Sequence, residues 1–268
     1  MTTSYLDRGE GRIAYDVQGE GPLVVCVPGM GDLRSNYRFT VPALVAAGYR
    51  VATMDLRGHG DSDDGFGAYD DVALASDILA LIAHLGGPAL VLGNSMGAGA
   101  AVIAASDDPA AVAGLGLLGP FVRNPKVNPL LLLVMRVMLV KPWGPAAWKA
   151  YYKTLYPGRR PADLAAHVDR VAGSLARGGH WRSFVRTTRT SHAPAEARLD
   201  GVRSPAIVVM GEKDPDFPDP AAEARFAGER LSGEVVLVPD SGHYPMADSP
   251  DVVNPALIAF AGKVFDRA

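Results

Sequence analysis

Short apolar runs alternate with helix-length segments along most of this chain. The apolar runs predict buried strands at residues 4–8, 12–17, 23–27, 50–54, 89–92, 112–118, 206–210 and 234–238. Helices are predicted between them, at residues 36–47, 71–85, 95–105, 221–231 and 252–265. The first two strands flank Gly9-Glu10-Gly11, which predicts a hairpin. This alternation is typical of a mostly parallel sheet that helices cover on both faces.

One long stretch interrupts the alternation. Between residues 121 and 203 we expect no strand, and Pro and Gly separate helical segments at 129–141, 145–155, 161–176 and 181–191. We therefore expect a helical insertion at residues 121–203. Residues 1–120 and 204–268 would form one α/β core, which the chain length of 268 residues allows.

Composition excludes several classes of protein. The formal net charge is −3 and no block of Lys or Arg accumulates, so we expect no nucleic-acid partner. Cys26 is the single cysteine, which rules out an intrachain disulfide and a multi-cysteine metal cluster. Residues 1–11 lack the apolar core of a signal peptide. The longest apolar stretch, residues 130–140, falls short of the roughly 20 residues that span a bilayer. We expect a soluble, cytoplasmic protein with no integral membrane span and an undetermined oligomeric state.

The segment Gly93-Asn94-Ser95-Met96-Gly97 is the first candidate for chemistry. It lies between a predicted strand and a helix of small residues. A sharp strand-to-helix turn projects a serine hydroxyl above the end of the sheet, and the flanking glycines avoid collisions with neighbouring backbone. Taken alone, the same segment could be a turn without chemistry.

A Gly-containing loop, Pro28-Gly29-Met30-Gly31-Asp32, follows the strand at 23–27. Such a loop can direct a backbone N–H at an oxyanion that develops beside Ser95. The N–H groups of Met30 and Met96 are the candidate donors. An ordinary strand-to-helix loop is the alternative interpretation.

Candidate acid and base residues follow the last two strands. Asp214 comes nearest the end of the strand at 206–210, with Asp216 and Asp219 as competitors that could instead cap the next helix. His243 follows the strand at 234–238, where a neutral imidazole can accept the serine proton. Asp248 is expected to cap the final helix.

Serine, acid and base in the order Ser95, Asp214, His243 resemble the α/β-hydrolase superfamily, in particular its smaller members with a helical cap. Residues 55–62, DLRGHGDS, are similar to a D-x-R-G-x-G-x-S segment of that superfamily that is usually structural, so we leave His59 out of the mechanism. The resemblance implies an eight-stranded, mostly parallel α/β-hydrolase fold. Many relatives carry His-Gly where Pro28-Gly29 stands here. Members that dehalogenate haloalkanes or open epoxides place Asp at the nucleophile position, and Ser95 argues against both activities.

The resemblance also implies the chemistry. We expect a carboxylic-ester hydrolase for small to medium, fairly apolar substrates, acting through an acyl-enzyme on Ser95 without metal or cofactor. Alternatives on the same triad are a carbon–carbon bond hydrolase, a lactonase or amidase, and a cofactor-free perhydrolase. A non-catalytic small-molecule receptor is the alternative from another class. The residues expected to contact substrate are Gly29, Met30, Phe121, Met135, Trp143 and Tyr244.

The apolar segment 130–140 of the insertion allows three interpretations. It could form a lid that lines an apolar pocket, or a helix buried against the core. Contact with a membrane or a lipid aggregate is the third and more distant interpretation.

Overall fold

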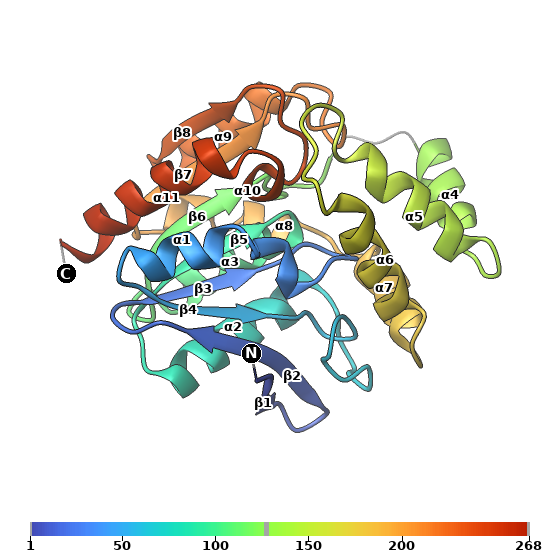
Figure 1. The fold of residues 1–268 in the computed structure, drawn as a ribbon, viewed down its shortest axis with the longest axis horizontal. Coiled ribbons are helices and arrows are strands. Elements are labelled where there is room, and N and C mark those ends of the chain that lie inside the picture. The colour runs from blue at the N-terminus through green and yellow to red at the C-terminus, as the bar shows by residue number, and fades with distance from the viewer. Residues whose placement is uncertain (1, 126–128, 267–268) are drawn as a thin grey trace.

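The computed structural model describes residues 2–125 and 129–266, which form an eight-stranded sheet in the order β1-β2-β4-β3-β5-β6-β7-β8 (Figure 1). Only the pairings of β2 with β1 and with β4 are antiparallel. The predicted, mostly parallel sheet is confirmed. Its strands are β1 (Ser4–Asp7), β2 (Arg12–Gln18), β3 (Leu23–Val27), β4 (Arg50–Met54), β5 (Ala89–Asn94), β6 (Val112–Leu118), β7 (Ala206–Gly211) and β8 (Glu234–Val238).

Helices cover both faces of the sheet because successive strand residues point to opposite sides. Val25 of β3 belongs to a core formed with α2 (Asp71–Leu85), α3 (Met96–Asp107) and α9 (Pro220–Leu231). The next residue, Cys26, belongs to a second core formed with α1 (Thr40–Ala46) and α11 (Pro250–Phe265). Both sides of the central strands are therefore apolar, which explains their continuous hydrophobic runs.

The strand register brings the loops of interest to one edge of the sheet. Val27 pairs with Gly93, Asn94 with Leu118, and Gly211 with Val238. The carboxyl ends of these parallel strands are therefore neighbours, and ligands of open α/β sheets bind at that edge.

Most of the helices that connect β6 to β7 lie beyond this edge, at the right of Figure 1, whereas α8 (Ala193–Glu196) packs against α3. We call residues 121–203 the helical insertion. Tyr152 and Phe184 pack into the second core, while α4 lies at the outer margin. The short helix α8 was not predicted. The helices of the insertion are α4 (Pro129–Met138), α5 (Gly144–Thr154), α6 (Leu164–Leu175), α7 (His180–Thr187) and α8 (Ala193–Glu196), followed by the 3₁₀ turn η2 (Leu199–Gly201).

Polar pairs link the helical insertion to the remainder of the chain. Two are buried imidazole–carboxylate pairs: His167 Nε2 lies 3.0 Å from Asp32 Oδ1, and His192 Nδ1 lies 2.7 Å from Asp71 Oδ2. A bidentate pair joins Arg38 to Asp163 at 2.6 and 2.7 Å. These contacts, together with the shared apolar core, hold the inserted helices over the carboxyl edge of the sheet.

Two local predictions differ from the structure. The helix expected at 36–47 is divided into a 3₁₀ turn η1 (Arg34–Tyr37) and α1, because the Asp32 carboxylate accepts the Leu33 N–H and the Asn36 side-chain amide. The prediction that Asp248 caps the final helix is wrong. Asp248 ends a short helix, α10 (Pro245–Asp248), and accepts the Ser241 hydroxyl at 2.7 Å and the Gly242 N–H at 2.9 Å.

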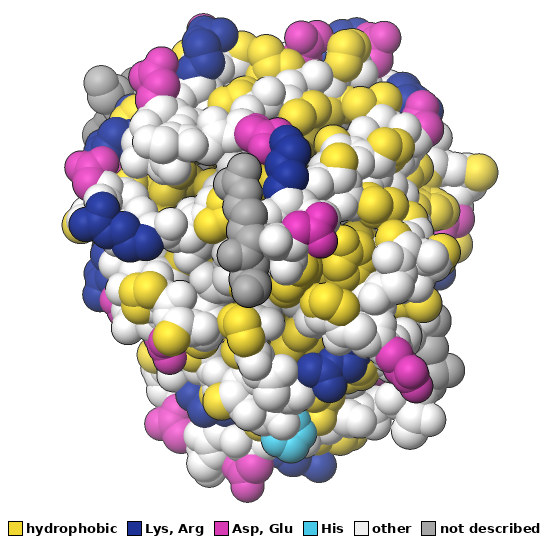
Figure 2. Space-filling view, turned by 90° about the vertical axis from the view of Figure 1, so that its left-hand side faces the viewer, with side chains coloured by type: hydrophobic (Ala, Val, Ile, Leu, Met, Phe, Trp, Pro, Cys, Tyr) yellow, Lys and Arg dark blue, Asp and Glu magenta, His cyan; other side chains and the backbone are white. Residues whose placement is uncertain are grey.

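No helix formed by the described residues is long and apolar enough to cross a membrane. Figure 2 shows the face on the side of the molecule away from the helical insertion, where acidic and basic side chains are interspersed.

Candidate active site

Ser95 occupies the turn between β5 and α3. Its backbone has φ 54° and ψ −121°, a conformation that is strained for a residue with a Cβ. The Ser95 N–H donates to the Leu118 carbonyl at 3.0 Å. A Cβ on Gly93 would lie 2.7 Å from the Ala98 Cα, and one on Gly97 would lie 2.6 Å from the Val27 carbonyl oxygen. Both glycines are therefore needed for this turn, as the sequence predicted.

His243 and Asp214 form a buried pair at the same edge. His243 Nδ1 donates to Asp214 Oδ2 at 2.7 Å, and both side chains are almost inaccessible to solvent. Burial opposes the charged imidazolium, but the carboxylates of Asp214 and Asp216 outweigh it and raise the pKa of His243 to about 9. A proton held at Nδ1 leaves Nε2 as the ring nitrogen that can accept a proton from a nucleophile.

The two competing aspartates occupy different positions. Asp219 accepts the Ala222 N–H at 2.9 Å and so caps α9. Asp216 Oδ2 lies 3.6 Å from His243 Nδ1, and its other oxygen accepts the Tyr151 hydroxyl from α5. Burial raises the pKa of Asp216. Asp214 therefore makes the short bond to the imidazole, while Asp216 is a second, more distant carboxylate that is joined to the helical insertion.

The loop at residues 28–32 lies against Ser95. A Cβ on Gly29 would lie 2.7 Å from the Ser95 Cβ, so the backbone of this loop directly adjoins the nucleophile candidate. The next glycine, Gly31, has φ 70° and donates its N–H to His59 Nε2 at 3.0 Å. The Gly31 carbonyl accepts Trp148 Nε1 at 3.3 Å. Both polar backbone groups of Gly31 are thus fixed by side chains, beside the candidate donor Met30.

Residues 55–62 pack beside the loop at residues 28–32 and contact it through His59. Asp55 accepts the Arg34 N–H at 2.8 Å and the Asp61 N–H at 3.0 Å. His59 is buried, and its Nδ1 donates to the Arg57 carbonyl at 2.9 Å. His59 Nε2 also reaches the loop beside Ser95 through the Gly31 N–H, a contact that we did not predict.

The expected substrate contacts fall into two groups. Gly29 adjoins Ser95, Met30 packs at the edge of the core, and the Phe121 ring lies 5.9 Å from the His243 ring. Tyr244 is buried and stacks on Tyr152 at 5.2 Å. Two others, Met135 and Trp143, are about half exposed on the outer part of the helical insertion, and no described contact joins them to Ser95.

Sequence reasoning missed two residues that touch the acid–base pair. Gly119 has φ 51°, and a Cβ there would lie 3.0 Å from the His243 carbonyl oxygen and 3.3 Å from Asp214 Oδ2. The Asn94 side-chain amide donates to the Leu118 carbonyl at 2.9 Å and to the His243 carbonyl at 3.2 Å. Gly119 directly follows β6 and Asn94 directly precedes Ser95, and these two positions were the only sequence features that could have indicated a role.

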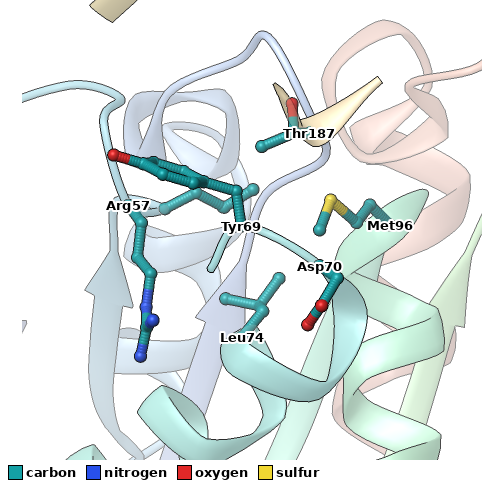
Figure 3. Close-up of a pocket in the computed structure, with 7 residues that line it drawn as sticks. Arg57, Tyr69, Asp70, Leu74, Met96 and Thr187 are labelled. Carbon is teal, nitrogen blue, oxygen red and sulfur yellow. The ribbon is translucent and has the colours of Figure 1, made fainter. Parts of the chain in front are cut away.

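A small cavity lies beside Met96, with Tyr69 and Thr187 also on its wall (Figure 3). Its volume is about 10 Å³, roughly that of one water molecule. It is therefore too small for an organic substrate.

The side chains of Asp214, Asp216 and His243 also meet a distance criterion for metal ligands. One ligand atom from each of Asp214, Asp216 and His243 lies within 4.8 Å of the others. However, His243 Nδ1 is already bonded to Asp214 Oδ2 at 2.7 Å. The arrangement is better suited to orienting an imidazole than to holding an ion.

Known proteins resemble this chain over most of its length. Residues 24–256 match the family model described as alpha/beta hydrolase family. The 2-(acetamidomethylene)succinate hydrolase of Mesorhizobium japonicum is 28% identical over 263 residues, covering 93% of this chain and 92% of that protein. The acetyltransferase component of the acetoin cleaving system of Pseudomonas putida is also 28% identical over 263 residues, covering 93% of this chain and 66% of that protein.

Among solved structures, the esterase EaEST from Exiguobacterium antarcticum superposes with a TM-score of 0.84 at 20% identity, covering 97% of this chain and 99% of that one. This likeness supports the fold. The family match extends over most of the chain, so the chain belongs to the alpha/beta hydrolase family and is an enzyme of the hydrolase class.

Proposed function

We propose that this protein hydrolyses carboxylic esters through an acyl-enzyme on Ser95, with His243 as the general base and Asp214 as its partner. The observation that carries the proposal is the 2.7 Å bond between His243 Nδ1 and Asp214 Oδ2, formed at the sheet edge where Ser95 occupies a strained strand-to-helix turn. A nucleophile, a base and a group that orients the base are the parts that acyl transfer requires.

In the proposed first step, His243 Nε2 takes the proton of Ser95 Oγ as that oxygen bonds to the ester carbonyl carbon. The N–H groups of Met30 and Met96 stabilise the resulting oxyanion. The tetrahedral intermediate then collapses, and the imidazolium gives its proton to the departing alcohol. Asp214 keeps Nδ1 protonated and offsets the positive charge throughout.

In the second step, water attacks the acyl-enzyme and His243 takes one of its protons. Collapse of the second tetrahedral intermediate releases the carboxylic acid, and the proton returns to Ser95 Oγ. Neither step needs an oxidant or a reductant.

The proposed substrates are small to medium, fairly apolar esters. Phe121 supports this choice, because its ring lies 5.9 Å from that of His243 and 4.6 Å from that of Phe217. Met30 packs against the same core. Apolar side chains beside the base favour an apolar acyl or alkyl group. We also propose that residues 121–203 act as a cap domain over a core of residues 1–120 and 204–268.

The experiment combines a fluorophosphonate probe with p-nitrophenyl esters of short to medium chain length. Wild-type protein should be labelled and should release p-nitrophenol in a burst, whereas Ser95→Ala should do neither. Ser106→Ala is the matched control, because Ser106 lies near the far end of α3, the helix that begins directly after Ser95. This variant should behave as wild type. Absence of labelling in the wild type would overturn the proposal in favour of a binding protein. Fast turnover of diketones with slow ester turnover would replace ester hydrolysis by carbon–carbon bond hydrolysis.

A further inference from the structure

The outer part of the helical insertion exposes a cluster of large apolar side chains. We define the outer patch as Leu133, Val134, Met135, Val137, Met138, Val140 and Trp143, which are each between 44% and 56% exposed. Other exposed large apolar residues described in the structure, such as Val72, Val235 and Val252, lie on α2, β8 and α11. Contiguous apolar patches of this kind mark interaction sites, whereas single exposed apolar residues do not.

The described side chains of α4 that belong to the outer patch are about half exposed. Figure 1 shows α4 at the margin of the molecule, outside α5. The half-buried Leu139, just beyond α4, packs against the core, and its carbonyl accepts Trp181 Nε1 at 3.1 Å. The chain is therefore anchored at the end of α4, while the side chains of the outer patch face solvent. A helix that is apolar on its exposed faces needs another apolar phase to cover it.

The charged residues near the outer patch indicate what kind of surface covers it. Residues 109–162 contain eight Lys and Arg and no Asp or Glu. Two of these cations, Arg123 and Arg159, are paired with acids elsewhere in the chain, Glu223 and Asp251, at 2.7 and 2.8 Å. Arg136 lies on α4, Lys141 lies three residues beyond the end of α4, and both are exposed. Lys153 is exposed near the end of α5, and Lys149 is paired with Asp169 of α6 at 2.7 Å. The face shown in Figure 2, by contrast, has interspersed charges of both signs.

We propose that the outer patch binds the surface of a lipid bilayer that contains anionic lipids. A helix of ten residues is about 15 Å long, which suits a helix that lies in the plane of the interface. The apolar side chains enter the boundary between head groups and acyl chains, and Arg136 and Lys141 contact lipid phosphates. Trp143 has an apolar ring and a polar N–H, the combination that is enriched at membrane interfaces. Trp143 Nε1 donates to the Val137 carbonyl at 2.9 Å, which holds the ring against α4.

This proposal goes beyond ester hydrolysis and does not depend on it. The test is sedimentation of the full chain with vesicles of phosphatidylcholine alone and of phosphatidylcholine mixed with phosphatidylglycerol. Wild-type protein and Ser95→Ala should bind the mixed vesicles equally, and added salt should weaken the binding. Leu133→Asp with Val137→Asp, or Arg136→Glu with Lys141→Glu, should reduce the partition coefficient roughly tenfold or more.

Matched controls lie elsewhere on the surface. Val252→Asp on α11 and Arg225→Glu on α9 change exposed residues of the same kinds and should bind vesicles as wild type does. Circular dichroism and the thermal midpoint should be unchanged in the patch variants and in these two controls, since each of their substituted side chains is solvent-exposed.

Three results would overturn the proposal. The first is equal binding to neutral and anionic vesicles, or none to either. The second is unchanged binding in the two pairs of patch substitutions. The third is a dimer, detected by light scattering, that does not bind vesicles and that the patch substitutions dissociate. This result would assign the outer patch to an interface between copies of this chain.

Discussion

His59 Nε2 accepts the backbone N–H of Gly31 at 3.0 Å and so holds the loop that adjoins Ser95. Burial lowers the pKa of His59 to about 4, which keeps the ring neutral and able to accept this bond near pH 7. The bond from Nδ1 to the Arg57 carbonyl at 2.9 Å sets the tautomer. We therefore propose that His59 is a positioning residue for the neighbouring Met30 amide, the proposed oxyanion donor.

We predict that His59→Ala lowers kcat for a p-nitrophenyl ester by about 10- to 100-fold, with a smaller change in KM, because the loop loses the acceptor that orients it. His59→Gln offers a side-chain oxygen as acceptor and should recover much of the rate. Steady-state kinetics of both variants provide the measurement. An unchanged kcat in His59→Ala would show that the Gly31 bond has no part in orienting the oxyanion donor.

The second carboxylate near the base should control the pH dependence of acylation. Because the pKa of His243 is raised to about 9, the imidazole is protonated below that pH, and kcat/KM should rise as pH increases through about 9. Asp216→Asn removes a nearby negative charge, so the rise should move to lower pH. Asp219→Asn keeps an N-cap on α9 and is the control, with a pH profile like that of wild type. Coincident profiles for Asp216→Asn and wild type would refute a role for this charge.

Gly119 should tolerate no side chain. A Cβ there would lie 3.3 Å from both His243 Nδ1 and Asp214 Oδ2, at a φ of 51°. Gly119→Ala should therefore displace the acid–base pair and reduce kcat, and should also lower the free energy of unfolding by about 1–2 kcal/mol. Gly173→Ala on α6 is the control, since a Cβ at Gly173 meets no atom within 4 Å. The control should retain activity, and its free energy of unfolding, measured in urea, should rise by about 0.5–1 kcal/mol. Full activity in Gly119→Ala would contradict the close packing.

The identity of the triad acid can be tested by replacing each aspartate in turn. Asp214→Asn should reduce kcat by a factor on the order of 10³–10⁴, because an amide favours the wrong tautomer of His243. Asp219→Asn should leave kcat unchanged, since Asp219 caps α9. A larger loss of kcat in Asp219→Asn than in Asp214→Asn would identify Asp219 as the triad acid.

Sequence pattern predicted the sheet well because the central strands are buried on both faces and appear as uninterrupted apolar runs, such as residues 23–27 and 206–210. The turn at Ser95 was predictable because it depends on local residues, the strand before it and the glycines beside it. The helix expected at 36–47 was less accurate, since the side chain of Asp32 reorganises the start of that segment.

Contacts between segments distant in sequence could not be predicted from local pattern. Tyr151 bonds to Asp216, and Trp148 bonds to Gly31, through the fold of the helical insertion rather than through sequence spacing. The same limit applies to Met135 and Trp143, whose apolar character alone could not distinguish a pocket wall from an exposed surface.

Trapping the acyl-enzyme tests the proposed reaction of Ser95 most directly. Wild-type protein is mixed with a p-nitrophenyl ester, quenched in acid within the burst, and analysed by intact mass and peptide mapping. We expect a mass increase equal to one acyl group, located on the peptide that contains Ser95 and absent from Ser95→Ala. An acyl group on another residue, or rapid ester turnover in Ser95→Ala, would contradict the proposed reaction.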